Sequence, residues 1–332
     1  MKKNNKNNNN ERRINNGKNI GRRVRGKKGA SRGKIKTEII SKNLSKTEIQ
    51  AEPHRLEGVY IIKSNKEFIA TKNLCPGEII YGEELITIED KKDIIAPIQK
   101  DKSESESEKD SSSESSSLIP KNIEVLNNQN IQSSQNKIEY RIWDIFYSKL
   151  GSAIKNGITN LYMKPGSQVL YLGAGNDSYS TISHISDLIG EKGIIYGVEK
   201  SEIKGLVLKT MSKKRENIKP IVQDARKPYI YKNYIPNLVD CIFINISEKD
   251  IATILSINAG FFLKTKGGFV CIININQEHP NNISQTEKFD EQIKLLREYN
   301  LYVKEFISLE NFYPGYAVIS GIFKPYRDFL DD

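Results

Sequence analysis

Short apolar runs alternate with longer amphipathic stretches along the C-terminal half of this 332-residue chain. Each run of four or five mostly apolar residues ends in a polar or glycine-containing turn and predicts a strand, and the stretches between runs predict helices. Five such units predict a parallel sheet covered on both faces. The expected strands are 168–172, 194–198, 219–222, 241–244 and 269–273. The expected helices are 179–189, 202–216, 250–263 and 285–299.

The last segment breaks this alternation. Residues 302–309 and 317–323 predict a β-hairpin, so the sheet is expected to end in antiparallel strands. The pattern therefore favours an α/β fold with a doubly wound, Rossmann-like methyltransferase sheet. A nicotinamide dehydrogenase is disfavoured by this ending and by the lack of a third glycine after the first strand.

A smaller β-rich segment precedes this sheet. Residues 59–62 and 68–71 are β-branched and aromatic runs, and 79–81 follows a Pro-Gly turn. They predict a small antiparallel N-terminal domain at 51–97, and the methyltransferase-like domain is expected to span 137–332. His184, on the first expected helix of that domain, is interpreted as a packed or hydrogen-bonded residue and not as a catalyst.

The formal net charge of +10 is unevenly distributed. Residues 1–36 hold fourteen Lys or Arg and one acid, a charge of +13, so the other residues together carry −3. Residues 1–50 lack aromatic side chains and predict a disordered basic tail rich in Gly, Arg and Asn. Such a tail suits contact with nucleic-acid phosphates or nuclear import. An acidic insert rich in Ser and Glu is expected at 98–136.

Some classes of protein are excluded by composition. No run of about 18 uncharged apolar residues predicts a membrane span, and the first thirty residues lack the apolar core of a secretory signal. The three cysteines lack a C-x-x-C pair, which disfavours a disulfide framework, a zinc ribbon or another metal site.

Three features at the ends of successive expected strands point to a nucleoside ligand. Gly173 and Gly175 follow the first strand, Glu199 closes the second and Asp224 follows the third. Taken singly, they are explained by turn chemistry, a solvated acid or a helix cap. Taken together, a glycine turn and two acids describe an adenosine site without a pyrophosphate cradle, as S-adenosylmethionine requires.

Several short segments carry a resemblance to a known family. They are Glu52-Pro53-His54-Arg55, Thr71-Lys72-Asn73-Leu74, Lys137-Ile138-Glu139-Tyr140-Arg141-Ile142-Trp143, Ser148-Lys149-Leu150, Lys164-Pro165-Gly166, Ser183-His184-Ile185-Ser186-Asp187 and Asp224-Ala225-Arg226. With them, residues 51 to about 325 resemble fibrillarin, the nucleolar rRNA 2′-O-methyltransferase of box C/D ribonucleoproteins. The resemblance implies S-adenosyl-L-methionine as cofactor and a location in the nucleus and nucleolus. It also implies four partners: box C/D guide RNA, pre-rRNA, a Nop-type scaffold protein and a kink-turn-binding protein. Binding to a membrane is not expected.

Fibrillarins resemble one another in a Lys-Asp-Lys-His catalytic set, and this sequence departs from it. Lys149 retains the first lysine, but the aspartate falls at Asn245 and the histidine at Tyr316. The second lysine falls at Asn274, or at Ile275 in the adjacent register. A ribose 2′-hydroxyl is a poor nucleophile until its proton is removed or its developing oxyanion is stabilised. Asparagine accepts no proton at neutral pH, so the replacements predict weak activity.

The cofactor positions implied by the resemblance are altered as well. The glycine loop is two residues longer than the family's Gly-Ala-x-x-Gly-Thr-Thr pattern, and Asp177 adds negative charge near the expected place of the cofactor's carboxylate. Lys200 replaces an aromatic residue that would stack on adenine. The expected cofactor-binding residues are Gly173, Ala174, Ser180, Thr181, Glu199, Lys200, Asp224 and Ala225.

We therefore expect a fibrillarin-like component of the box C/D particle that acts in pre-rRNA processing and rRNA 2′-O-methylation and is itself weakly active or inactive. The alternative is an active S-adenosylmethionine-dependent RNA 2′-O-methyltransferase in which another group replaces the missing base. Asp177, Glu248 and Tyr316 are the nearby candidates for that group.

Overall fold

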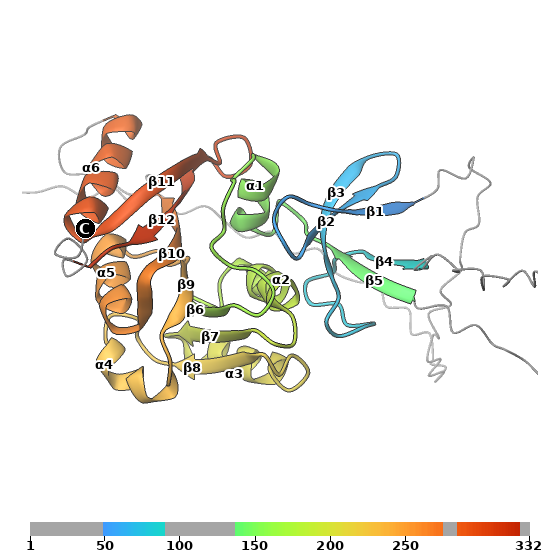
Figure 1. Ribbon diagram of the computed structural model, residues 1–332, viewed down its shortest axis with the longest axis horizontal. Coiled ribbons are helices and arrows are strands. Elements are labelled where there is room, and N and C mark those ends of the chain that lie inside the picture. Colours follow the sequence, from blue (N-terminus) through green and yellow to red (C-terminus); the bar gives the residue numbers. More distant parts are fainter. Residues whose placement is uncertain (1–48, 90–136, 275–283, 326–332) are drawn as a thin grey trace, which may run out of the picture. The chain divides into compact units, whose positions relative to one another are not determined.

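The computed structural model describes residues 49–89, 137–274 and 284–325 of the chain. All of the acidic insert and all but the last two residues of the basic tail lie outside these residues. The described strands form two sheets, one of five strands and one of seven, and helices flank the larger sheet (Figure 1). No helix within the described ranges is long and apolar enough to cross a membrane.

The smaller sheet is antiparallel throughout, with the strand order β1-β2-β3-β5-β4. Its strands are β1 (Gln50–Pro53), β2 (Val59–Lys63), β3 (Glu67–Lys72), β4 (Leu85–Glu89) and β5 (Lys137–Ile142). Apolar residues on one face, among them Ile62, Ala70 and Tyr140, form its core. The methyltransferase-like domain was expected to begin at residue 137, but β5 pairs with β3 and β4 in this smaller sheet.

One predicted strand of this sheet is wrong. Residues 79–81 form a loop, because the backbone N–H groups of Ile80 and Tyr81 donate to the Glu83 carboxylate at 2.8–3.1 Å and not to a neighbouring strand. The strand that pairs with β5 is β4, a few residues later.

The larger sheet has the order β11-β12-β10-β9-β6-β7-β8. Its strands are β6 (Gln168–Leu172), β7 (Ile194–Glu199), β8 (Ile218–Val222), β9 (Val239–Ile244), β10 (Leu263–Asn274), β11 (Leu301–Ser308) and β12 (Tyr316–Phe323). The pairings from β8 to β10 are parallel, and β12 pairs antiparallel with both β10 and β11. The prediction of a doubly wound sheet that ends in an antiparallel hairpin is therefore confirmed.

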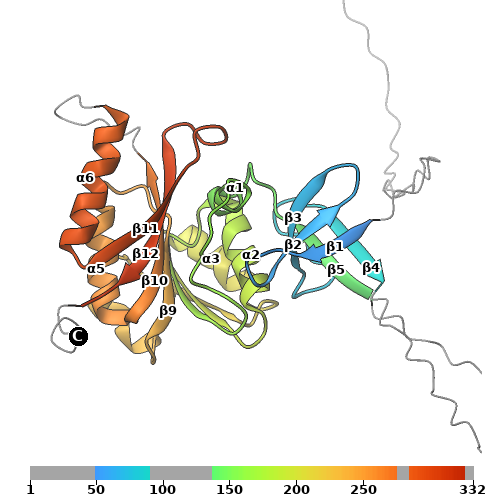
Figure 2. The same cartoon turned by 45° about the horizontal axis from the view of Figure 1, so that its top comes forward.

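Helices cover both faces of this sheet (Figure 2). On one face lie α1 (Lys149–Lys155), α2 (Ser180–Ile189) and α3 (Glu202–Met211). On the other lie α4 (Pro228–Tyr231), α5 (Ile251–Phe262) and α6 (Gln285–Glu298). Two 3-10 turns, η1 (Asp177–Tyr179) and η2 (Lys232–Tyr234), complete the described helical elements. Helix α6 begins with a reciprocal capping box between Ser284 and Glu287, which satisfies two N–H groups of the first turn.

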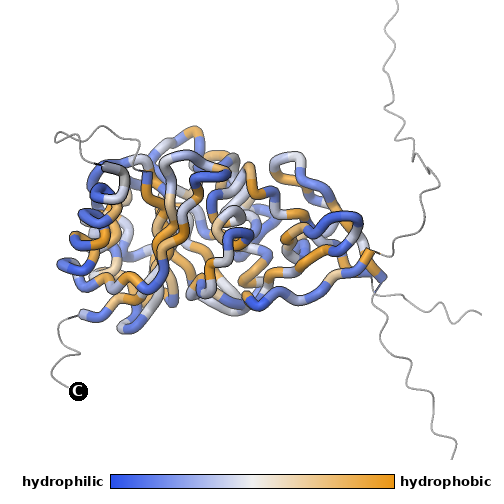
Figure 3. Tube along the Cα trace, turned by 90° about the horizontal axis from the view of Figure 1, so that it is seen from above, coloured by the Kyte–Doolittle hydropathy of each residue, from blue (hydrophilic) through white to orange (hydrophobic). Residues whose placement is uncertain are grey.

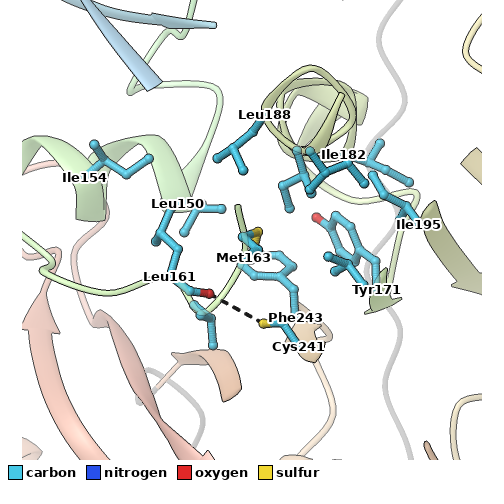
Figure 4. Close-up of a cluster of buried hydrophobic side chains, with 14 of the residues drawn as sticks. Leu150, Ile154, Leu161, Met163, Tyr171, Ile182, Leu188, Ile195, Cys241 and Phe243 are labelled. Carbon is cyan, nitrogen blue, oxygen red and sulfur yellow. Dashed lines mark hydrogen bonds between the residues drawn. The ribbon is translucent and has the colours of Figure 1, made fainter. Parts of the chain in front are cut away.

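The pleat of the strands separates two apolar clusters on opposite faces of the sheet. Tyr171 and Phe243 point toward α1 and α2, whereas Leu170 and Ile242 point toward α5. Figure 4 shows the first cluster, in which Leu150 lies over the sheet among the other buried side chains. Hydrophobic stretches of the chain gather mainly in the interior, and hydrophilic stretches lie mainly on the outside (Figure 3).

A buried ionic cluster joins the smaller sheet to α2. Arg141 of β5 donates to Glu83 and, at 2.7 Å, to Asp187 of α2, and all three side chains are fully buried. Arg215 is paired with the same Asp187. Two guanidinium groups and two carboxylates thus neutralise one another, as buried charges must.

His184 lies beside this cluster, stacked on Trp143 at 4.7 Å between ring centroids. Its ring nitrogens lie 2.8 Å from the Thr71 and Tyr81 hydroxyls. Because Thr71 donates to Asp187, it accepts from Nδ1 of the neutral ring. His184 is therefore a packed and hydrogen-bonded residue, as the sequence predicts.

Candidate active site

The strands β6, β7, β8 and β9 end at one edge of the larger sheet, and the candidate site lies there. Ligands of open α/β sheets bind outside the carboxyl ends of the strands, because the loops that follow them diverge. The loop after β6, the start of α1, the last residue of β10 and the first residue of β12 contribute side chains to one network at this edge. Among the described residues, no group of three His, Cys, Asp or Glu side chains is arranged to hold a metal ion.

Lys149 is the first residue of α1, and its neighbours fix its position. Ser148 caps the helix by accepting from the Gly151 N–H, and its hydroxyl lies 2.8 Å from that of Thr181 on α2. Leu150 is fully buried in the core. With one neighbour capping and the other buried, the Lys149 side chain projects toward the edge of the sheet, where it is 13% exposed.

Asp177 is the ion-pair partner of Lys149. Lys149 Nζ lies 2.7 Å from Asp177 Oδ1, and Asp177 Oδ2 accepts from Asn245 Nδ2 at 2.8 Å and from the Thr181 hydroxyl at 3.2 Å. The carboxylate therefore has three donors, and only 7% of the side chain is exposed. The negative charge that the sequence places near a ligand is already neutralised by a lysine.

The other two positions of the implied catalytic set meet through strand register. Asn274, the last residue of β10, is paired with Tyr316, the first residue of β12. Asn274 Nδ2 donates to the Tyr316 hydroxyl at 3.0 Å. The structure thus brings Lys149, Asn245, Asn274 and Tyr316 to one place.

Aromatic rings surround the ammonium group of Lys149. Its Nζ lies 5.0 Å from the ring centroids of Tyr313 and Tyr316, within the range of cation–π attraction. Burial, assisted by the charge of Asp177, raises the pKa of Tyr313, and burial raises that of Tyr171 far above its ordinary value. Both phenols therefore stay protonated near neutral pH and cannot act as bases there.

A cavity of about 230 Å³ lies next to this network, between the ends of β6, β7 and β8. It is lined by Gly173, Asn176, Val198, Glu199, Lys200, Lys204, Gln223, Asp224, Ala225, Arg226, Ile246, Ser247, Glu248 and Ile254. Gly173 separates the cavity from Asn245: with φ +84° its backbone suits glycine, and a Cβ there would overlap the Asn245 carbonyl oxygen. The glycine turn is thus required for the close approach of the two loops.

Glu199 is held in place from two sides. Its Oε2 accepts from the Gly175 N–H and its Oε1 from the Ser201 N–H, each at 2.9 Å. Each carboxylate oxygen retains a lone pair for a further donor. Asp224, at the end of the next strand, is 27% exposed in the same cavity. Two fixed acceptors at neighbouring strand ends fit ribose hydroxyls and an exocyclic amine, so the residues present fit an adenosine group.

A sequence model of the Fibrillarin family matches residues 51–325. The chain is 34% identical over 308 residues to the rRNA 2′-O-methyltransferase fibrillarin of Encephalitozoon cuniculi, covering 92% of this chain and 89% of that protein. The chain belongs to the fibrillarin family. Rat fibrillarin is 34% identical over 277 residues, which cover 83% of this chain and 70% of the relative.

Solved structures of the family share the fold. Methanococcus jannaschii fibrillarin, described as a pre-rRNA processing protein, is 27% identical, with a TM-score of 0.64 over 83% of this chain and 98% of that one. Aeropyrum pernix fibrillarin, crystallised with natively bound S-adenosyl-L-methionine, is 28% identical, with a TM-score of 0.62 over 83% and 99%. A chain from a fibrillarin/Nop5p complex is 32% identical, with a TM-score of 0.51 over 56% and 85%.

The predicted cofactor positions of this fibrillarin-family site divide into two groups. Gly173, Glu199, Lys200, Asp224 and Ala225 line the cavity. Ala174, Ser180 and Thr181 are fully buried outside its lining. In this structure, Thr181 bonds to the Ser148 and Asp177 side chains.

Two polar residues of the fibrillarin-family cavity were missed by the sequence analysis. Asn176 donates to the Asn245 carbonyl at 2.6 Å and accepts from Lys204 Nζ at 2.9 Å, so the two side chains bridge the glycine loop to α3. The signal for Lys204 was a lysine in the first turn of the helix that follows Glu199. The direction of the Lys204 side chain, however, depends on the conformation of the glycine loop. Glu248, a candidate base, is instead paired with Arg226 at 2.7 Å, away from Lys149.

Proposed function

We propose that this chain is a fibrillarin-type component of the box C/D ribonucleoprotein that acts in pre-rRNA processing and rRNA 2′-O-methylation, and that it is itself weakly active or inactive. The observation that carries the proposal is the cavity at the ends of β6, β7 and β8, whose lining fits an adenosine group and whose turn at Gly173 packs against Asn245. Asn245 in turn bonds to Asp177, the ion-pair partner of Lys149. Family membership supports the class of reaction, and this arrangement supports a cofactor pocket near a cation.

S-Adenosyl-L-methionine is the cofactor we propose, and when bound it supplies a methyl group on a sulfonium. Glu199 would hold the ribose hydroxyls, and Asp224 would accept from the adenine amine. Lys200 has no aromatic ring to stack on adenine. Its side chain is 63% exposed, and its Nζ lies 3.9 Å from Glu248 Oε1. Adenine affinity therefore depends on hydrogen bonds and on apolar cavity residues such as Ile246.

Lys149 is the group we propose to act on the acceptor. Its positive charge would stabilise the negative charge that develops on a ribose 2′-oxygen as the hydroxyl proton leaves. Asn245 and Asn274 accept no proton, and Tyr316 carries a phenol where the family has histidine. The hydroxyl proton must then leave to solvent, and transfer is slow because a positioned base contributes about 10²–10⁴-fold.

The partners and location follow from the family. We propose a Nop-type scaffold protein, box C/D guide RNA, pre-rRNA and a kink-turn-binding protein as partners, and the nucleolus as location. The similarity to a chain crystallised in a fibrillarin/Nop5p complex supports the scaffold partner. Incubation of the full chain with a Nop-type scaffold and a box C/D guide RNA, followed by size-exclusion chromatography, tests this part. Co-elution of all three supports it, and exclusion of the chain from the particle contradicts it.

Calorimetric titration with S-adenosylmethionine tests the cofactor part. Saturable one-to-one binding is expected, weakened at least tenfold by Glu199→Gln and unchanged by Glu298→Gln on the exposed face of α6. The absence of binding to the wild-type chain, or equal binding by all three proteins, would refute the proposed pocket.

A second candidate function is favoured by one observation. The Lys149–Asp177 ion pair gives the site an acidic partner for lysine that the alignment of position 245 does not supply. An active methyltransferase with a rewired site is therefore the alternative. Methyl transfer to a guide-paired RNA at a rate equal to that of a relative with the full catalytic set would establish it.

A further inference from the structure

The carboxylate of Asp177 lies where the side chains of positions 149 and 245 converge. It accepts from Lys149 Nζ at 2.7 Å through one oxygen and from Asn245 Nδ2 at 2.8 Å through the other. A side chain at position 245 is thus within one hydrogen bond of the acid that neutralises Lys149. Asn245 itself is only 5% exposed, so the local arrangement is enclosed by protein.

The enlarged glycine loop is what brings Asp177 there. Asp177 begins the 3-10 turn η1 with φ +51°, and Tyr179 ends the turn with φ +63°. Residues other than glycine rarely adopt this left-handed region, and such strain persists only where surrounding contacts hold it. The three donors to Asp177, together with the bridge from Asn176 to the Asn245 carbonyl, are those contacts.

We propose that Asp177 supplies the acid that the family places at position 245, so that this site keeps a lysine–carboxylate pair but carries the carboxylate on a different loop. In this arrangement Asn245 binds the relocated carboxylate as a neutral donor. Asp177 is a positioning residue, because it acts on the reaction only through Lys149. The proposal rests on the proposed function for its chemical meaning, but the exchange of carboxylates is a property of the folded chain.

This assignment has a consequence for position 245. Asn245→Asp, which restores the family residue, would place a second carboxylate at hydrogen-bonding distance from Asp177. Two carboxylates that share a site repel, and the pKa of one is strongly raised. The unfolded chain lacks this repulsion, so the destabilisation is full at pH 8 and declines as the pH falls and one carboxylate binds a proton.

Thermal unfolding of five full-length proteins tests the exchange: wild type, Asn245→Asp, Asp177→Asn, the double variant Asp177→Asn/Asn245→Asp, and Asn245→Ala. At pH 8 the melting temperature of Asn245→Asp should fall by several degrees, and the double variant should melt within about 2 °C of the wild type. Asn245→Ala is the matched control, since it removes the same hydrogen-bond donor without adding a charge. Asn245→Asp should be less stable than this control at pH 8 and not at about pH 5.

A second readout reports on Lys149 without requiring catalysis. Lysine side-chain NMR, with the Lys149 signal assigned by Lys149→Met, follows the chemical shift of the Lys149 Nζ atom, which reports its ion pair. The Lys149 Nζ signal should move in Asp177→Asn, because its ion pair is lost, and should return toward its wild-type position in the double variant. A merely structural role for Asp177 would not restore the signal through a carboxylate at another position.

The outcomes separate this inference from the proposed function. If Asn245→Asp is as stable as Asn245→Ala at pH 8, or if the double variant does not restore the Lys149 Nζ signal, the exchange is wrong even if the chain binds S-adenosylmethionine. If the exchange holds and the cofactor does not bind, the proposed function fails and the paired carboxylate stands as a property of the fold.

Discussion

Asn274 and Tyr316, at positions where the resemblance to fibrillarins implies a lysine and a histidine, are joined by a hydrogen bond of 3.0 Å. The strand register makes them partners, because Asn274 ends β10 and Tyr316 begins β12 directly opposite. A change at one of them therefore alters the surroundings of the other. The two replacements form one local unit that is neutral throughout.

Restoring both family residues should raise methyl transfer more than restoring either one. In Asn274→Lys/Tyr316→His, the contact between the positions is rebuilt with groups that bind and release protons, whereas each single variant leaves a titrating group against a neutral partner. We expect the double variant to transfer methyl groups to guide-paired RNA at least about tenfold faster than the wild type. A gain equal to the product of the two single gains would contradict the coupling of these positions.

Gly173→Ala should lower the affinity of the candidate cofactor cavity for S-adenosylmethionine. Gly77→Ala is the matched control. Both glycines have φ above +80°, but a Cβ at Gly173 would overlap the Asn245 carbonyl, whereas one at Gly77 would meet no atom within 4 Å. Each variant bears the strain of the left-handed backbone, about 1–2 kcal/mol, and only Gly173→Ala must also move the loop. Calorimetry should show S-adenosylmethionine affinity lowered at least tenfold in Gly173→Ala and unchanged in Gly77→Ala. Equal affinities would show that the turn does not shape the cavity.

Arg141→Met should be strongly destabilising, because it leaves the buried carboxylates of Glu83 and Asp187 with less positive charge. Removing one partner of a buried ion pair costs about 3–5 kcal/mol. Lys63→Met, which breaks the exposed pair with Glu52, is the control and should change stability little. Equilibrium unfolding of the full chain in urea measures both. Comparable losses in the two variants would show that the buried cluster does not hold the smaller sheet on α2.

Stability should fall below pH 6.5 because of His184. Burial, with the positive charges of Arg141 and Arg215, holds the pKa of His184 well below its usual value of 6.5. His184 therefore binds a proton near pH 6.5 in the unfolded chain but not in the folded chain. The free energy of unfolding falls as the pH falls, by up to about 1.4 kcal/mol per pH unit. His184→Gln cannot titrate and should show a flatter dependence between about pH 7.5 and 5.5. Identical slopes of unfolding free energy in the two proteins would contradict a buried neutral histidine.

Much of the larger sheet could be predicted from sequence, because its strands are apolar runs with clear turns. The expected strand 168–172 coincides with β6. The ends of the two expected hairpin strands lie no more than one residue from those of β11 and β12. The expected helix 202–216 is too long: α3 ends at Met211, and the turn that follows leads into the buried Arg215. Helical periodicity continues through that turn, and burial of a charged residue against α2 is a tertiary effect that periodicity does not contain.

The cofactor cavity was predictable in part, because acids at the ends of parallel strands meet at one edge. Glu199 and Asp224 follow that rule, and both line the cavity. The Lys149–Asp177 pair did not follow from any spacing. It depends on left-handed backbone angles at Asp177 and Tyr179, which no spacing in the sequence announces and which the contacts of the folded loop hold.

The rate of methyl transfer shows whether this chain is a weak or a fully active methyltransferase. Single-turnover transfer of tritiated methyl groups to a guide-paired RNA should be measured with the full chain and, side by side, with a fibrillarin that retains the Lys-Asp-Lys-His set, each assembled with its Nop-type scaffold. We expect a rate at least about a hundredfold below that of the intact relative, because the resemblance implies proton-handling residues where this chain has Asn274 and Tyr316. A rate within tenfold of the relative's would refute weak activity and would identify the chain as a fully active enzyme with a rewired site.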